Sequence, residues 1–300
     1  MIARRIAVRL GGIAVVVVAA TATAWLLFHW LRPSLFAGED QTLWEYLRRA
    51  FLHFDFGRSQ QGSRAEVADL IRAGFPNDVA VLAGGLLLGF GAGVAGGIWC
   101  ARNPRGWASR ALQAAAMVAL CAPVYVVGLG ALLLFGQDIG TVTHGVPLRY
   151  RELGDDGLGP WLGSIVVPWI VVGLPLAAMC LRTMLGQMVE AGDEEFVRAA
   201  RAKGLSERTV LRRHVAPTAL APTAMLASSA MPVLITNVVL VEQVFSIPGV
   251  FRDLTRSIGT ANVPLILGMT AVGALLIGVT TMLFDLFLLR LDPRVRRSAR

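Results

Sequence analysis

Few groups of residues in this chain have the types and spacing that chemistry would need. Gly91-Ala92-Gly93-Val94-Ala95-Gly96 spells the glycine fingerprint of a dinucleotide-binding turn. That chemistry requires a strand and a tight turn before the glycines, and here they lie inside a long apolar run. Gly89, Gly93 and Gly97 are spaced four residues apart, which instead predicts close packing between two helices.

Other candidates for catalysis or metal binding are equally weak. Asp55-Phe56-Gly57 has no accompanying lysine strand or catalytic loop, so it is not a kinase metal motif. The three cysteines lie within or beside apolar runs, where we expect packing rather than a disulfide, and no two of the four histidines have metal-ligand spacing. These residues are Cys100, Cys121, Cys180, His29, His53, His144 and His214. We expect no metal site and no catalytic residue. Without a GxxxxGKS or GxxxxGKT loop, the chain is not expected to bind or hydrolyse ATP, or to be an enzyme by itself.

The elements that carry these residues are strongly apolar. Of the 300 residues, 55% are hydrophobic and 16% charged, and the mean hydropathy is +0.61. About six apolar blocks are long enough to cross a hydrocarbon core, which takes roughly 20 residues as a helix. Because the blocks are continuously apolar, they do not alternate as barrel strands do. We predict an all-α integral membrane protein with about six transmembrane helices, near 8–31, 79–101, 112–136, 161–183, 218–241 and 264–289.

The first block has two interpretations. Arginines precede an apolar run with small residues around Ala22 and Ala24, as in a signal peptide. The run continues through Leu31, which is longer than the usual signal core of roughly 7–15 residues. An uncleaved anchor is therefore favoured, and Arg4-Arg5 is better explained as a topology signal than as a twin-arginine export signal.

Charge placement predicts the orientation. With both termini in the cytoplasm, the basic residues concentrate on that side, in the segments 4–9, 102–110, 182–213 and 290–300, while the outer segments are net acidic. This pattern follows the positive-inside rule. The net charge of +8 therefore indicates topology and contact with anionic lipid, not nucleic-acid binding.

The chain divides into an N-terminal stub and first span (1–31), an outer segment (32–78) and a five-helix core (79–300). In the outer segment we predict a short helix, packed on the membrane face or on neighbouring spans; a partner outside the membrane is the alternative. Its apolar side is Leu43, Leu47 and Phe51, with Trp44 and Phe54 nearby, and its polar side is Glu45, Arg48 and Arg49. The loop near 137–160 is predicted to be irregular. Glu242 and Asp285 are placed near span ends, within reach of water or headgroups, and are interpreted as structural.

The segment from Glu190 to Pro217 is a charged, helix-prone insert in this apolar chain. A helix is predicted from Phe196 to Lys203, ending at Gly204, and Ser206 can cap a second helix. We call residues 190–217 the elbow. A membrane domain with such an elbow and no energy site of its own suggests that a separate subunit delivers the energy. The alternative is an ordinary loop with a solvated charged face.

The amino-acid sequence of the elbow resembles a known family signature. Arg198-Ala199-Ala200-Arg201-Ala202-Lys203-Gly204, then nine residues, then His214-Val215-Ala216-Pro217, resembles the EAA signature of binding-protein-dependent ABC importer permeases. The stretch from Ala200 to His214 is close to the form of the dipeptide/oligopeptide/nickel class. Arg198 departs from that signature, which is usually acidic there, and so do His214 and Ala216, where apolar residues are usual.

Further stretches are similar to the same class in the same order. They are Phe54–Ser59, Val241–Val250, Asp285-Leu286-Phe287 and Leu291–Arg296. Gly74-Phe75-Pro76-Asn77-Asp78 stands where the class has RxPxT, and Thr281 stands where an Asn is common. These departures weaken a claim about the substrate rather than about the class.

The resemblance implies a B-type permease subunit of the type I importer fold in the bacterial inner membrane, importing di- or oligopeptides by alternating access. Its expected partners are a homologous second permease, cytoplasmic ATPase subunits or domains and an extracytoplasmic binding protein. ATP and Mg²⁺ would lie on the ATPases, with no cofactor in this chain. The implied ATPase-coupling residues are Glu195, Phe196, Arg198, Ala199, Ala200, Arg201, Lys203, Gly204, Leu205 and Pro217, with Ala199 and Ala200 permitting close contact. The outer loop or gate candidates are Glu242, Phe245, Pro248 and Gly249, and Pro217, Pro222 and Pro232 are expected to bend the fifth span.

Alternatives remain open at this level. The same importer class carries nickel chelates, haem or other small solutes. A secondary carrier or channel that works without ATPases is a different class of function, and a membrane scaffold that does not transport is a third.

Overall fold

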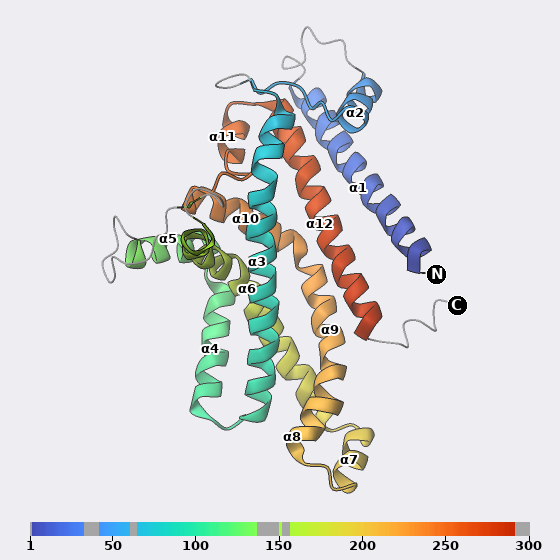
Figure 1. Cartoon of the computed structure of the whole chain (residues 1–300), viewed down its shortest axis with the longest axis vertical. Coiled ribbons are helices and arrows are strands. Elements are labelled where there is room, and N and C mark those ends of the chain that lie inside the picture. Colours follow the sequence, from blue (N-terminus) through green and yellow to red (C-terminus); the bar gives the residue numbers. More distant parts are fainter. Residues whose placement is uncertain (1, 33–41, 61–64, 137–149, 152–156, 292–300) are drawn as a thin grey trace. The chain divides into compact units, whose positions relative to one another are not determined.

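The computed structural model describes residues 2–32, 42–60, 65–136, 150–151 and 157–291. Within these residues every regular element is a helix, as the apolar blocks predicted (Figure 1). The helices are α1 (Ile2–Leu31), α2 (Leu43–Leu52), α3 (Val67–Arg102), α4 (Trp107–Cys121), α5 (Val124–Phe135), α6 (Leu158–Gly192), α7 (Glu195–Ala202), α8 (Glu207–Val210), η2 (Leu211–Val215), α9 (Ala216–Ser229), α10 (Met231–Phe245), α11 (Leu254–Gly259) and α12 (Val263–Leu291). The C-terminal motif at 292–296 and most of the predicted loop at 137–160 lie outside the described residues.

Four of these helices are long and apolar enough to cross a membrane, and up to six spans result if each of two bent helix pairs counts as one. The predicted blocks at 112–136 and 218–241 correspond to these two bent pairs. The helices α4 and α5 meet at 110°, because Pro123 has no N–H group and forces Ala122 into an extended conformation. The second pair bends by 54° at the break between α9 and α10.

The three prolines predicted to bend the fifth span act differently. The break lies at Ala230, directly before α10, in which Pro232 occupies the second position. Pro217 and Pro222 lie within the unbroken helix α9. Before Pro217 the chain widens into the π-helical turn η2, where the Ala216 N–H bonds the Leu211 carbonyl. Since Pro217 cannot donate to a preceding carbonyl, a widened turn is a known accommodation.

The chain forms two compact units. Unit 1 comprises residues 1–80 and 238–282, and unit 2 comprises 81–237 and 283–300. In unit 2 the helix α6 packs against α4, α5 and α9. Gly89 and Gly93 on α3 lie against the backbone of α6, where a Cβ would come 2.6 Å from the Gly173 and Ala177 carbonyl oxygens. A Cβ at Gly97 would come 2.7 Å from the Met184 side chain.

Unit 1 contains α1, α2, α11 and parts of α3, α10 and α12. The short helix α2 was predicted, and its packed face is centred on Tyr46 and Ala50 rather than on the predicted apolar residues. Tyr46 and Ala50 are buried, the three residues of the predicted apolar side are half-buried, and Trp44 is 73% exposed. Burial raises the pKa of Tyr46. Because Tyr46 and Ala50 lie one turn apart, they set the centre of the packed face, where α2 contacts α1.

Candidate functional site

The elbow forms a short helical hairpin at the end of α6. The chain leaves α6 at Gly192, forms the eight-residue helix α7 and then turns at Gly204 into α8. Gly204 has a φ of +78°, in the left-handed region that favours glycine, and its N–H bonds the Arg201 carbonyl at 2.9 Å. The predicted helix stop at Gly204 is therefore present. Ser206 takes the N-cap position of α8, but its hydroxyl bonds Thr209 Oγ1 at 2.9 Å and makes no cap bond.

The inner face of the elbow is part of the core of unit 2. Val197 and Ala200 on α7 are buried with Val210 and Val215. The same cluster contains Met184 and Met188 of α6 and Ala219 of α9. The elbow is thus anchored by apolar packing to α6 and α9.

Arg201 joins three parts of the elbow. Its Nε and Nη2 atoms donate to the two carboxylate oxygens of Glu207 at 3.0 and 2.8 Å, and its Nη1 atom donates to the Gly192 carbonyl at 2.9 Å. The hydrogen bonds from Arg201 to Glu207 raise the pKa of the guanidinium. The bidentate contact with Glu207 links α7 to the start of α8, and the bond to Gly192 links α7 to the end of α6.

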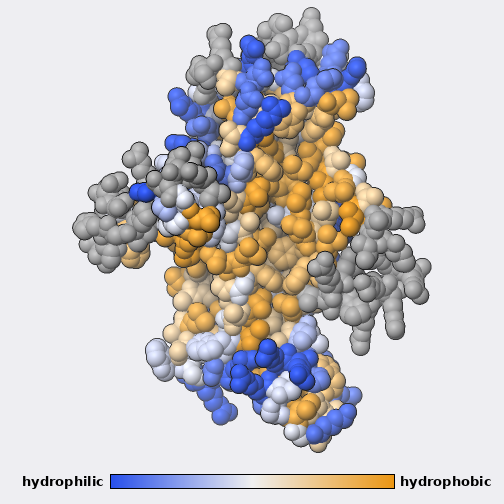
Figure 2. Space-filling view, viewed as in Figure 1, coloured by the Kyte–Doolittle hydropathy of each residue, from blue (hydrophilic) through white to orange (hydrophobic). Residues whose placement is uncertain are grey.

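The outer face of the elbow is exposed and mixed in character. Phe196 and Leu205 are exposed apolar residues, at 43% and 40%, among exposed charged residues. Figure 2 shows the elbow as a hydrophilic surface with an apolar patch, beyond the apolar surface of the long helices of unit 2. Of the predicted coupling residues, all but Ala200 lie on the exposed surface. Ala200 is buried, so it supports the elbow from within.

A second cluster lies in unit 1, where the segment after α10 crosses α3. The Asn77 side-chain amide donates to the Pro248 carbonyl at 3.0 Å, and the Val250 N–H donates to Asp78 Oδ1 at 2.9 Å. A Cβ at Gly74 would come 2.6 Å from the Val250 nitrogen. The absence of a side chain at Gly74 therefore lets the two backbones approach closely. We call residues 246–251 the crossing segment.

The predicted gate residues belong to this cluster. Phe245 and Glu242 are buried, and Gly249 lies directly against the Glu242 carboxyl group. The expectation that water or headgroups reach Glu242 was wrong, because its side chain is fully buried. Sequence reasoning also missed Asn77 and Asp78 as partners of the crossing segment. An acid and an amide after Pro76, at the start of an apolar run, were the available signal.

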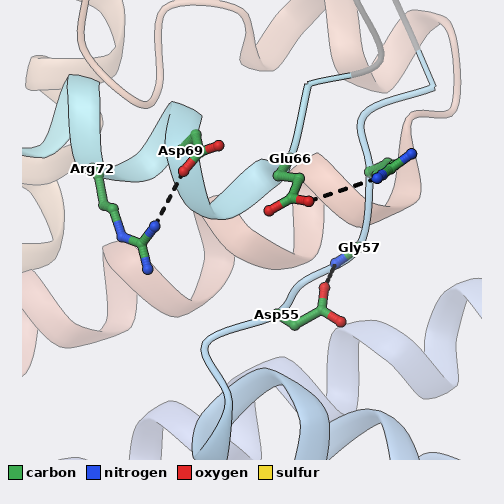
Figure 3. Close-up of polar contacts among 6 residues, drawn as sticks. Asp55, Gly57, Glu66, Asp69 and Arg72 are labelled. Carbon is green, nitrogen blue, oxygen red and sulfur yellow. Dashed lines mark hydrogen bonds and ion pairs between the residues drawn. The ribbon is translucent and has the colours of Figure 1, made fainter.

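The stretch from Phe54 to Ser59 is held near the start of α12 in unit 1. The Asn262 side chain donates to Ser59 Oγ at 2.9 Å and accepts from the Gln60 N–H at 3.2 Å. Asp55 accepts from the Gly57 N–H at 2.9 Å, which closes a local turn (Figure 3). These bonds are those of a structured connection and bring no nucleophile or metal-ligand group together.

Metal and redox chemistry find no support in the part of the chain that the structure describes. It contains no group of three or more His, Cys, Asp or Glu residues that could hold a metal ion. The three cysteines are free; Cys100 and Cys180 are buried in helix packing, and Cys121 is exposed.

Comparison with known proteins identifies the family. Residues 93–297 match the family described as the inner membrane component of binding-protein-dependent transport systems. The chain belongs to this family. It is a multi-pass permease of the inner membrane, and its all-helical architecture is that of type I importer permeases.

Individual relatives agree with this assignment. A Brucella abortus protein named as a peptide transport system permease is 28% identical over 257 residues, which cover 85% of this chain and 78% of the relative. A Brucella ovis protein named as a peptide permease is 26% identical over 242 residues, or 81% and 75%. The dipeptide transport system permease protein DppB of Lactococcus lactis is 27% identical over 263 residues, or 86% and 82%.

The family match covers the two clusters unequally. It includes the whole elbow and the crossing segment with Glu242, but it begins after Asn77 and Asp78. The elbow is thus part of the permease family's shared region. Asp78, whose carboxyl group lies against Gly249 as that of Glu242 does, belongs to the part of α3 outside that match.

Proposed function

We propose that this permease is a subunit of an ATP-driven, binding-protein-dependent peptide importer, and that its elbow couples the membrane helices to cytoplasmic ATPases. The observation that best supports this proposal is that α7 has both buried and exposed apolar residues. Val197 and Ala200 are packed against α6 and α9, while Phe196 of the same helix is 43% exposed. Such a helix can be gripped from outside and can transmit the movement to the long helices.

The substrate class rests on the relatives. Proteins named as peptide or dipeptide permeases align with most of this chain. Selection of the peptide would fall mainly to the extracytoplasmic binding protein. A homologous second permease would complete the translocation pathway.

The energy would come entirely from partner subunits. ATP and Mg²⁺ would bind the ATPases, and this chain would hold neither a cofactor nor a catalytic residue. With the basic segments 102–110 and 182–213 in the cytoplasm, the elbow faces the ATPases and both termini are cytoplasmic. When the ATPases close on ATP, the push on α7 would reach α6 and α9 through the Val197 cluster and switch the pathway between its two openings.

The test is reconstitution of the assembled importer in vesicles, with its partner ATPases and binding protein. Peptide should stimulate ATP hydrolysis and accumulate inside. Phe196→Ala should weaken ATPase binding about 30-fold or more, because truncating an aromatic hot spot costs about 2 kcal/mol or more. Trp107→Ala is the control, since Trp107 is also an exposed aromatic residue of unit 2 but lies outside the elbow.

Different outcomes separate the parts of the proposal. Unchanged ATPase binding by the Phe196 variant would refute the coupling role of the outer face. If a nickel chelate or haem stimulates hydrolysis and peptides do not, the peptide assignment is wrong while the importer assignment stands. Uptake that proceeds without ATPases would refute both.

A further inference from the structure

Two acidic side chains meet in the interior of unit 1. Asp78 of α3 and Glu242 of α10 are each fully buried. Both carboxyl groups lie around Gly249, where a Cβ would overlap Asp78 Oδ1 and the Glu242 carboxyl. Burying one unpaired carboxylate is already strongly unfavourable, and two in contact also repel each other.

The carboxyl oxygens of Asp78 and Glu242 have too few hydrogen-bond donors around them. The two carboxyl groups lie against the same point beside Gly249, so they are close neighbours. Asp78 Oδ1 is satisfied by the Val250 N–H, but Asp78 Oδ2 and both Glu242 oxygens have no donor among the described residues. The backbone amides of Phe251 and Arg252 lie near the Glu242 carboxyl group but make no hydrogen bond to it. Since an ionised carboxylate only accepts, the two carboxyl groups can form a hydrogen bond with each other only when one group carries a proton.

Among the described residues of unit 1, no neighbouring cation offsets the charge. On α3, Arg72 pairs with Asp69 at 3.1 Å, and both side chains are 63% exposed. Arg252, Asp253 and Arg256 after the crossing segment are exposed as well. Glu242 is the sole charged residue of α10, and α12 has none between 263 and 282. Two carboxylates are also too few for a metal cage, and the described residues supply no third ligand of that kind.

We propose that Asp78 and Glu242 form a proton-binding site, in which one shared proton joins the two carboxyl groups and fastens α10 to α3. The proton comes from water and returns to water, and no other reactant takes part. The bound pair carries a single negative charge, with Asp78 still accepting from Val250. This inference does not rest on the proposed function, because it concerns the internal contact of unit 1.

The probe is infrared spectroscopy of the full-length chain in detergent at neutral pH. A protonated carboxyl group gives a C=O stretch that shifts in heavy water. The unmutated chain should show this band, and carboxyl ¹³C-labelling of either glutamate or aspartate should shift it. Glu242→Gln and Asp78→Asn should each abolish the band, since the new amide donates to the remaining carboxylate without a proton. Asp69→Asn should leave it unchanged, because Asp69 is an exposed acid of the same helix.

Labelling keeps the test decisive even if a variant fails to fold, because it needs no substitution. Absence of the band from the unmutated chain would overturn the proposal. A band that survives both Glu242→Gln and Asp78→Asn in folded protein would do so as well. Unfolding midpoints supply a second measure: the two amide variants should unfold at higher temperature than Glu242→Ala and Asp78→Ala. Equal midpoints for amide and alanine variants would contradict a hydrogen bond between the two groups.

Discussion

Arg201 and Glu207 form a bidentate ion pair that closes the elbow, with N–O distances of 3.0 and 2.8 Å. The two side chains are 41% and 56% exposed, so solvent screens their attraction. The main effect of the ion pair is to fix the geometry of the elbow. The third hydrogen bond of Arg201, to the Gly192 carbonyl, makes the angle between α6, α7 and α8 depend on one side chain.

Replacing Arg201 should therefore change the geometry of the elbow without a large change in the free energy of unfolding. We expect Arg201→Lys to change the unfolding free energy by less than about 1 kcal/mol, because an exposed pair contributes little. Uptake by the reconstituted importer should nevertheless fall, since lysine keeps the charge but cannot make the planar fork. Arg208→Lys on α8 is the control and should retain full uptake. Full uptake by the Arg201 variant would show that the bidentate contact with Glu207 is dispensable.

Gly204 should tolerate no side chain without strain. Its φ of +78° predicts that Gly204→Ala destabilises the protein by about 1–2 kcal/mol, although the added Cβ would meet no atom within 4 Å. Gly204→Pro also removes the N–H bond to Arg201 and should abolish uptake while membrane insertion persists. Gly186→Ala in α6 has equal space and ordinary helical backbone, so thermal unfolding should show no loss of stability. Unchanged uptake with Gly204→Pro would count against coupling through the elbow.

The packing of α3 on α6 predicts opposite results for two glycines of one helix. A Cβ at Gly93 would meet the Ala177 backbone and Cys180, so Gly93→Ala should destabilise unit 2 by about 1–3 kcal/mol through overpacking. A Cβ at Gly91 meets nothing within 4 Å, so Gly91→Ala should be neutral or slightly stabilising. Detergent unfolding curves of the two variants measure the difference. Similar curves would mean that the helices separate easily at this contact.

The start of α2 should loosen in acid. Thr42 and Glu45 form a capping box, and the bonds from Thr42 lower the pKa of the Glu45 carboxyl. A lowered folded-state pKa means that the stabilisation is present above the ordinary value of 4.5 and is lost as the pH falls through the folded value. Amide hydrogen exchange at residues 43–46 should therefore accelerate at acid pH beyond its intrinsic pH dependence. Glu45→Gln keeps an uncharged acceptor and should lose this extra acceleration; the same acid response in that variant would refute the role of Glu45.

The accuracy of sequence-based prediction differed between elements for physical reasons. Long apolar blocks predicted helices well, because a span must satisfy its backbone hydrogen bonds within itself. The elbow's turn at Gly204 was also predictable, because that signal is local. The packed face of α2 was not predicted to include Tyr46. Tyrosine was not counted as an apolar residue because of its hydroxyl group, although its ring is apolar and buries well. The break at Ala122 was not predicted, since hydropathy is continuous across it, whereas a bend in the fifth span was expected and lies at Ala230.

By itself, the sequence determined the membrane class, the helical architecture and the elbow, since each depends on composition or on residues close together in the chain. Only the tertiary structure decided which residues of the elbow face outward, so that Phe196 is exposed and Ala200 is not. It also decided that Asp78 and Glu242 meet. These two acids are separated by more than half of the chain, and no local pattern encodes a contact that exists only when α3, α10 and the crossing segment pack together.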